Sequence, residues 1–172
     1  MYYIELKSKE DISKFHLPRY KEIPDVGLFL EQTVRLINHY LEPLGGVEIT
    51  PSMVSNYVKN KLIAPPTRKQ YHRDQVGYLI FMSVAKTVMS LEDIRNLFSL
   101  QQEHFTPEVA YDYFCDEFEN ILQFVFGNKD TLKEIGTHNT DERIFLRTVI
   151  ITIAHKIYLD KYLQEMKKAQ KK

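Results

Sequence analysis

The stretch that decides the fold runs from Thr50 to Arg73 and reads TPSMVSNYVKNKLIAPPTRKQYHR. It holds five Lys or Arg residues and no Asp or Glu, although the 172-residue chain has 23 basic and 23 acidic residues. Such local asymmetry, rather than net charge, decides what a docking face attracts. Thr50-Pro51 is typical of a capped helix start, and Pro65-Pro66 of a helix stop. The stretch predicts a short helix followed by a basic, aromatic-tipped hairpin.

The helix predicted from Thr50 to about Ile63 has two different faces. The apolar face carries Met53, Val54, Tyr57, Val58 and Leu62, with the spacing of an amphipathic helix. The opposite face carries Ser52, Ser55, Asn56, Lys59 and Asn60. Short polar side chains and cations of this kind read base edges in the major groove. An ordinary solvated face has the same pattern, so both interpretations stay open for the helix alone.

The residues after the helix strengthen the first interpretation. Arg68, Lys69, Tyr71, His72 and Arg73 fall within six positions. A wing needs cations and an aromatic to reach phosphates or a minor groove. We therefore expect DNA contacts from two groups of residues, Ser52, Ser55, Asn56 and Lys59 on the helix and Arg68, Lys69, Tyr71 and Arg73 on the wing. Tyr57 is expected to pack in the core, and His72 to be a surface residue.

Helical periodicity and capping signals continue on both sides of this unit. They predict helices over residues 25–41, 74–88, 90–100, 106–126 and 141–167, with caps at Thr50, Ser90 and Thr106. A turn over 44–49 would complete a helix-turn-helix, although it is longer than usual. We expect a mainly all-α chain in three parts. These are an N-terminal arm or short strand (1–24), a winged helix-turn-helix with a small β wing (25–102), and a C-terminal helical region (103–172).

The same residues resemble a known pattern. Tyr57–Ile63, Pro65-Pro66, Arg68–Tyr71, a long apolar helix and Ser90–Ile94 are similar to the winged-helix head of MerR regulators, over roughly residues 48–100. Most of the chain resembles an uncharacterised bacterial family with a MerR-like head, on the residues Tyr57–Tyr71 and Pro24–Gln32. Two departures are visible: Ser55-Asn56 replaces the usual Arg-Tyr pair, and Lys61 stands where a Gly normally ends the helix. The resemblance implies a transcriptional regulator that binds double-stranded DNA.

In MerR-like regulators the region after the head carries dimerisation and sometimes ligand sensing. The resemblance therefore implies a homodimer and an unknown small-molecule or protein effector. The last helix is apolar on more than one side, and either the 106–126 helix or a second copy must cover it. We expect the aromatics of residues 105–126 to form core, with a ligand pocket as the alternative. A dimer would suit DNA half-sites about one helical turn apart.

The acidic part of the chain offers a different partner. Residues 104–142 carry nine acids and two bases, and Asp112, Asp116 and Glu119 share a helix face that we expect to be solvated. Two alternative functions follow. One is a protein-interaction module that uses this acidic, aromatic face of a winged-helix scaffold, and the other is a small-ligand sensor.

Several classes of protein are disfavoured. The single Cys115 rules out an internal disulfide and Cys-pair metal sites, and His104, His138 and His155 lack ligand spacing. P-loop, GxGxxG, GxSxG and HExxH motifs are absent from the sequence. We expect no enzyme, no metal and no cofactor. The most apolar run, 149–154, is too short for a membrane span, and no signal peptide is apparent. The expected location is cytoplasmic.

Overall fold

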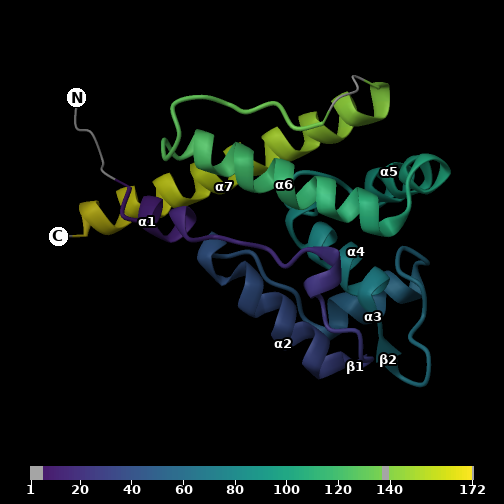
Figure 1. Cartoon of the computed structure of the whole chain (residues 1–172). Helices are drawn as coiled ribbons and strands as arrows, with labels where there is room; N and C mark the ends of the chain where they lie inside the picture. Colours follow the sequence, from purple (N-terminus) through teal and green to yellow (C-terminus); the bar gives the residue numbers. More distant parts are fainter. Residues whose placement is uncertain (1–5, 137–139, 172) are drawn as a thin grey trace.

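The structure, a computed structural model, describes residues 6–136 and 140–171, so His138 lies outside the described residues. This part of the chain contains seven α-helices and one two-stranded sheet, which confirms the prediction of a mainly helical protein. Figure 1 shows two layers. Helices α2 (Leu30–Leu41) and α3 (Pro51–Lys59) lie below with the sheet, and α6 (Pro107–Val125) and α7 (Asp141–Gln170) lie side by side above. Helix α4 (Arg73–Ala85) packs against α2, α6 and α7.

Helix α4 has almost no solvent face. Ten of its thirteen residues are buried, as its run of Val, Leu, Ile, Phe and Met requires. Gly77 lets α4 approach α6 closely, because a Cβ at this position would lie 3.3 Å from the ring of Tyr111. The hydrophobic core therefore runs without interruption from the lower layer to the upper one.

Three predicted helix caps are present. The Thr50 hydroxyl accepts from the Met53 amide at 3.2 Å, and the Ser90 hydroxyl accepts from the Asp93 amide at 3.1 Å, at the start of α5 (Leu91–His104). Thr106 accepts from the Val109 amide at 3.3 Å and opens α6. Each hydroxyl satisfies an amide that has no partner within its helix.

One predicted helix begins later than expected. Residues 25–29 are not helical: Leu28–Phe29 form strand β1, and α2 starts at Leu30. The side-chain Oε1 of Gln32 accepts from the Phe29 amide at 2.9 Å and fixes this start. Strand β1 pairs antiparallel with β2 (Gln70–Tyr71), which lies 41 positions or more away along the chain. The periodicity of 26–41 contains no sign of this long-range pairing.

The long turn between α2 and α3 is held by side chains from elsewhere. The Asn38 amide nitrogen donates to the Ile49 carbonyl at 2.9 Å, and its Oδ1 accepts from the Ile49 amide at 2.8 Å. Lys86 donates to the Glu48 carbonyl at 2.7 Å. These bonds replace the short turn of a compact helix-turn-helix with a longer but fixed connection.

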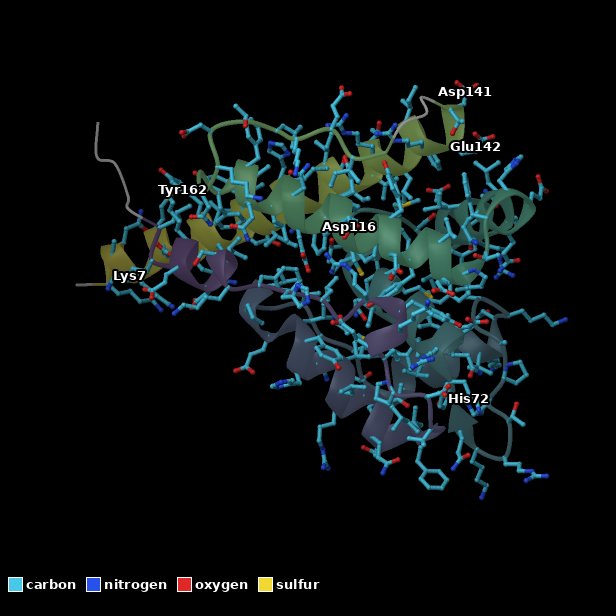
Figure 2. The ribbon with its side chains drawn as sticks, in the orientation of Figure 1. Lys7, His72, Asp116, Asp141, Glu142 and Tyr162 are labelled. Atoms are coloured by element: carbon cyan, nitrogen blue, oxygen red, sulfur yellow. The ribbon has the colours of Figure 1, made fainter. Side chains whose placement is uncertain are left out.

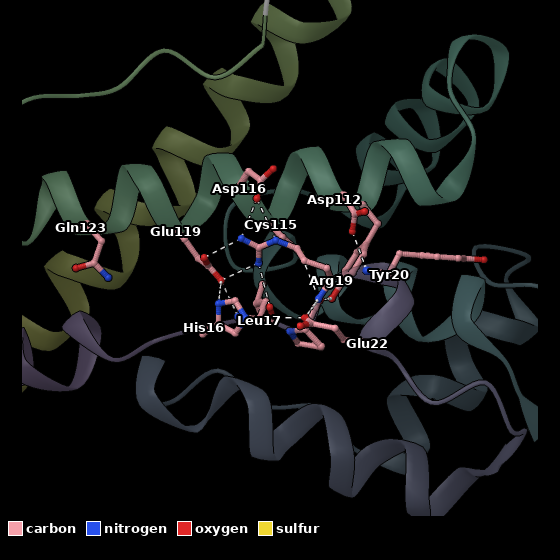
Figure 3. A network of polar contacts seen from close by, with 12 residues as sticks. His16, Leu17, Arg19, Tyr20, Glu22, Asp112, Cys115, Asp116, Glu119 and Gln123 are labelled. Carbon is pink, nitrogen blue, oxygen red and sulfur yellow. Dashed lines mark hydrogen bonds and ion pairs between the residues drawn. The ribbon is translucent and has the colours of Figure 1, made fainter.

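The N-terminal segment lies on the body of the protein, along α6. It contains helix α1 (Ser8–Ser13), an extended stretch and the 3-10 helix η1 (Tyr20–Glu22), and no strand lies within residues 6–24. Figure 3 shows the contacts. Two guanidinium nitrogens of Arg19 each donate to a Glu119 carboxylate oxygen at 2.9 Å, and Arg19 also pairs with Asp116 at 2.8 Å. We call residues 14–22 the strap.

The strap uses the acidic face that the sequence predicted to be solvated. Glu119 also accepts from the Leu17 amide at 2.7 Å, and Asp112 accepts from the Tyr20 amide at 2.7 Å. The Glu119 side chain is only 17% exposed. The prediction of a solvated face is therefore wrong for Glu119, because backbone amides of a distant segment need these acceptors. The Asp116 side chain on the same face remains 48% exposed, so only part of this face is withdrawn from solvent.

Helices α6 and α7 also share a buried charge. Glu117 is fully buried and pairs with the Arg147 side chain at 2.9 Å. Burial raises the pKa of the Glu117 carboxyl, whereas the nearby positive charges of Arg147 and Arg143 act in the opposite direction. The ion pair joins α6 to α7 inside their contact.

We predict that Glu119→Ala lowers the free energy of unfolding by about 2 to 3 kcal/mol, because it removes the acceptor of the Leu17 amide and two of the hydrogen bonds of the Arg19 guanidinium, which keeps Asp116. Urea unfolding measures this. Glu108→Ala is the matched control, since Glu108 lies on the same helix, is 42% exposed and meets Lys21 only at 3.8 Å. Equal effects of the two substitutions would contradict the role assigned to Glu119.

Candidate nucleic-acid interface

Helix α3 presents the predicted polar face to solvent. Ser52, Ser55, Asn56 and Lys59 are all exposed, while Val54 and Tyr57 are buried on the opposite side. Tyr57 is 4% exposed, which confirms its expected place in the core. Asn60, the C-cap residue, donates from its side chain to Oδ1 of Asn56 at 2.9 Å. The outer face of α3 is thus a row of hydroxyl, amide and ammonium groups.

The end of α3 explains the unusual Lys61. Lys61 has a φ of 59°, in the left-handed region that favours glycine. Its amide donates to the Val58 carbonyl at 3.0 Å, and the Leu62 amide donates to the Tyr57 carbonyl at 2.9 Å. These are the two bonds of a Schellman motif. Lys61 therefore adopts the conformation that glycine usually takes at a helix end, and it adds a positive charge next to the polar face of α3.

The tip of the hairpin has the same property. Thr67 and Gln70 exchange backbone hydrogen bonds of 3.1 and 2.9 Å, so Arg68 and Lys69 are the two central residues of a tight turn. Their φ values are 51° and 65°. A two-residue turn with two positive φ values normally takes Asn-Gly or a similar pair. Here two exposed cations occupy it.

The register of the sheet corrects one predicted contact. Leu28 pairs with Tyr71 and Phe29 with Gln70, so each pair faces a different side of the sheet. Tyr71 faces the core and is 4% exposed, whereas Phe29 is 51% exposed. The prediction of Tyr71 as the exposed aromatic of the wing is therefore wrong. Phe29 is the aromatic residue on the outer face. Its position could not be predicted from the sequence, because the strand that pairs with β1 is distant along the chain.

Arg73 is also used inside the protein. Its Nε donates to the Ile23 carbonyl at 2.7 Å and its Nη2 to the Lys21 carbonyl at 2.9 Å. Its guanidinium lies 5.9 Å from the ring centre of Tyr20 and 3.6 Å from Asp25. The prediction that Arg73 contacts DNA is not supported by this geometry, because the side chain anchors the strap end to α4. The exposed His72 beside it agrees with the expected surface role.

The candidate interface therefore consists of Ser52, Ser55, Asn56 and Lys59 on α3, Lys61 at its end, Arg68 and Lys69 at the wing tip, and Phe29 on β1. Lys61, Arg68 and Lys69 are the non-glycine residues with positive φ among residues 6–136 and 140–171. Figure 2 shows His72 near the sheet and Asp116, Asp141 and Glu142 in the other layer, whereas Asp25 and Asp74 lie near the base of the hairpin. This part of the surface offers cations and hydrogen-bond donors.

Other kinds of site find little support in the described ranges. In residues 6–136 and 140–171 no group of three or more His, Cys, Asp or Glu side chains could hold a metal ion. Within the same residues, no helix is long and apolar enough to cross a membrane. Cys115 is buried, and burial raises the pKa of its thiol to about 12.

The geometry defines a mainly helical protein with a small two-stranded sheet and a basic turn beside an exposed polar helix. The chain belongs to the family described as domain of unknown function (DUF1836), whose model matches residues 18–114. The matched region begins in the strap, includes the whole candidate interface and ends within α6. No curated protein and no solved structure matches the chain.

We predict that Lys61→Gly raises the free energy of unfolding by about 1 kcal/mol, because glycine adopts the left-handed conformation without the Cβ clash. The matched control is Lys59→Gly, two positions earlier in the last helical turn. This substitution should lower the free energy of unfolding by up to about 1 kcal/mol. Urea unfolding of both variants is the measurement. A destabilised Lys61→Gly would contradict the conformational assignment.

Proposed function

We propose that the protein is a DNA-binding transcriptional regulator with a MerR-like winged helix-turn-helix head, acting as a dimer. The order β1, α2, α3, β2, α4 supports this proposal, since α3 follows a helix and a turn and precedes a basic hairpin. In this assignment α3 enters the major groove and the turn at Arg68-Lys69 reaches the phosphate backbone. The match to the family supports neither DNA nor any other partner.

The observation that carries the proposal is the conjunction of backbone strain and positive charge. Non-glycine residues in the left-handed region each cost about 1 kcal/mol or more. Glycine or asparagine at Lys61, Arg68 and Lys69 would relieve this cost. Such strain is common where the side chain has a function. Exposed cations at a rigid turn fit a polyanion, because phosphate binding needs charge at fixed positions.

The polar face of α3 supports contact with bases rather than with phosphates alone. Ser55 and Asn56 carry donors and acceptors that can discriminate base edges, whereas a lysine-rich helix would bind every sequence alike. Lys59 on the same face adds a cation that can meet a phosphate whatever the sequence. The interface thus combines specific and non-specific contacts.

Dimerisation is supported by the outer face of α7. Val149, Ile150, Ile153 and Ile157 are buried against the rest of the chain, so α6 and its neighbours cover one side of the helix. Ile144, Phe145, Leu159 and Leu163 remain 40% to 54% exposed. A second copy of this helix is the proposed cover, and a two-fold pair would present two α3 helices to adjacent half-sites.

DNA binding should show a steep dependence on salt. For the Arg68→Asn/Lys69→Gly variant we predict weaker binding to all sequences and a slope of log K against log salt smaller by roughly two, one for each lost phosphate contact. The substituted turn has the residues preferred for its conformation, so unfolding cannot explain the loss. Fluorescence anisotropy across a salt series measures the slope.

The control for this variant is Lys129→Asn/Lys133→Asn, which removes two exposed lysines from the other layer and should leave the slope unchanged. Asn56→Ala should alter the selected DNA sequence instead. If the purified protein retards no genomic fragment at about 50 mM salt, where electrostatic binding is strong, the proposal fails.

The dimer is tested separately. Leu159→Glu/Leu163→Glu places two charges on the exposed face of α7 and should convert a dimer to a monomer in sedimentation velocity. Val26→Glu, at a residue 69% exposed and away from α7, is the control and should leave the mass unchanged. A wild-type monomer at high concentration would refute this part of the proposal.

A further inference from the structure

An aromatic cavity lies between the two layers, behind the candidate interface. Its walls are rings from three helices, with Tyr78 and Phe81 on α4, Phe98 on α5, and Tyr111 and Phe114 on α6. The cavity has a volume of about 60 Å³ and adjoins a wider apolar groove of about 290 Å³ between α5, α6 and the start of α7. The two spaces share Leu97, Gln101, Ala110 and Leu146 as lining residues.

The rings around the cavity are already arranged by their own contacts. Tyr78 meets Phe98 edge-on at 4.8 Å between ring centres, and Phe81 meets Phe114 edge-on at 5.0 Å. Protein interiors are normally packed at crystal-like density, so space next to five aromatic rings is a departure from ordinary packing. A flat molecule of one ring would add the offset and edge-on contacts that such rings prefer.

The polar atoms of the lining have partners within the protein. The Tyr78 hydroxyl donates to Gln101 at 2.8 Å, and the Tyr111 hydroxyl donates to the Pro18 carbonyl at 2.7 Å. The Tyr20 hydroxyl donates to Asp74 at 2.5 Å. A charged or strongly polar molecule would lose its water without gaining equivalent bonds from these groups. An apolar cavity of about 150 Å³ stays dry and accepts benzene, so a ring fits here only where the cavity of about 60 Å³ opens into the groove of about 290 Å³.

From these contacts we propose that the cavity is a binding site for an uncharged, apolar aromatic molecule. The molecule enters through the groove between α5 and α6 and places its ring beside Leu97 and Ala110, where the groove meets the aromatic cavity. This site is separate from the candidate nucleic-acid interface, and its occupation does not require DNA.

The position of the cavity gives the site a consequence for the interface. Tyr20 and Asp74 line one end, and Asp74 is three residues after Tyr71 in strand β2. Tyr20 belongs to the strap, and Asp74 belongs to the first turn of α4, which follows the wing. A molecule in the cavity therefore lies close to both elements. An effect on DNA affinity would rest on the proposed function, whereas ligand binding itself does not.

The experiment uses the full chain, labelled with ¹⁵N and titrated with toluene and with phenol in the absence of DNA. Toluene should shift the amide resonances of Tyr78, Phe98 and Ala110 in a saturable manner, with a Kd of about 1 mM or lower. Phenol has the same ring, but its hydroxyl must lose its water beside an apolar wall whose tyrosine hydroxyls already donate to protein acceptors, so it should bind at least about fivefold more weakly. Equal affinities would overturn the assignment of an apolar ligand.

Two substitutions locate the site. Ala110→Leu fills the boundary between cavity and groove and should weaken toluene binding at least about tenfold. Ala169→Leu, the same change on the exposed end of α7, should leave it unchanged. Leu97→Ala enlarges the space at the same boundary and should allow naphthalene to bind. This gain of binding keeps the proposal testable if Ala110→Leu does not fold. No saturable shift with wild type, or shifts that persist unchanged in Ala110→Leu, would overturn the proposal.

Discussion

The burial of α4 on all sides is the constraint on which the rest of the structure depends. A helix without a solvent face needs partners in every direction, so α2 covers it below while α6 and α7 cover it above. Gly77 permits the closest of these approaches, against Tyr111. Because α4 begins two residues after strand β2 ends, the same packing fixes the hairpin that carries Arg68 and Lys69. The hairpin of the candidate interface is therefore connected directly to the central helix of the core.

Charge in this protein has two separate uses. On α6, carboxylates bind the chain's own N-terminal strap, where Glu119 satisfies a guanidinium and a backbone amide at once. In the segment from Lys61 to Lys69, cations remain exposed although their backbone conformation favours glycine or asparagine. Hydrogen bonds and ion pairs within the protein explain the first group. The second group has no such internal role, and this contrast supports an external polyanion as its partner.

Much of the fold could be predicted from the sequence because local signals repeat. The caps at Thr50, Ser90 and Thr106 and the apolar periodicity of α2 to α6 depend on residues within one helix turn. The outward position of Ser52, Ser55, Asn56 and Lys59 follows from the same periodicity. Predictions were wrong where a distant segment decided the outcome. Tyr71 turned inward because β2 pairs with β1, and Arg73 was taken by the carbonyl groups of Lys21 and Ile23.

By itself the sequence determined a mainly helical chain with an acid-free, basic unit at residues 50–73, because helix periodicity and charge are properties of neighbouring residues. Only the tertiary structure decided which of those side chains stay available. It placed Lys61, Arg68 and Lys69 in left-handed conformations, brought Phe29 to the outer face of the sheet, and paired Glu119 of α6 with the strap. It also enclosed an aromatic cavity among α4, α5 and α6. Each of these depends on contacts between residues far apart in the chain, which no local pattern records.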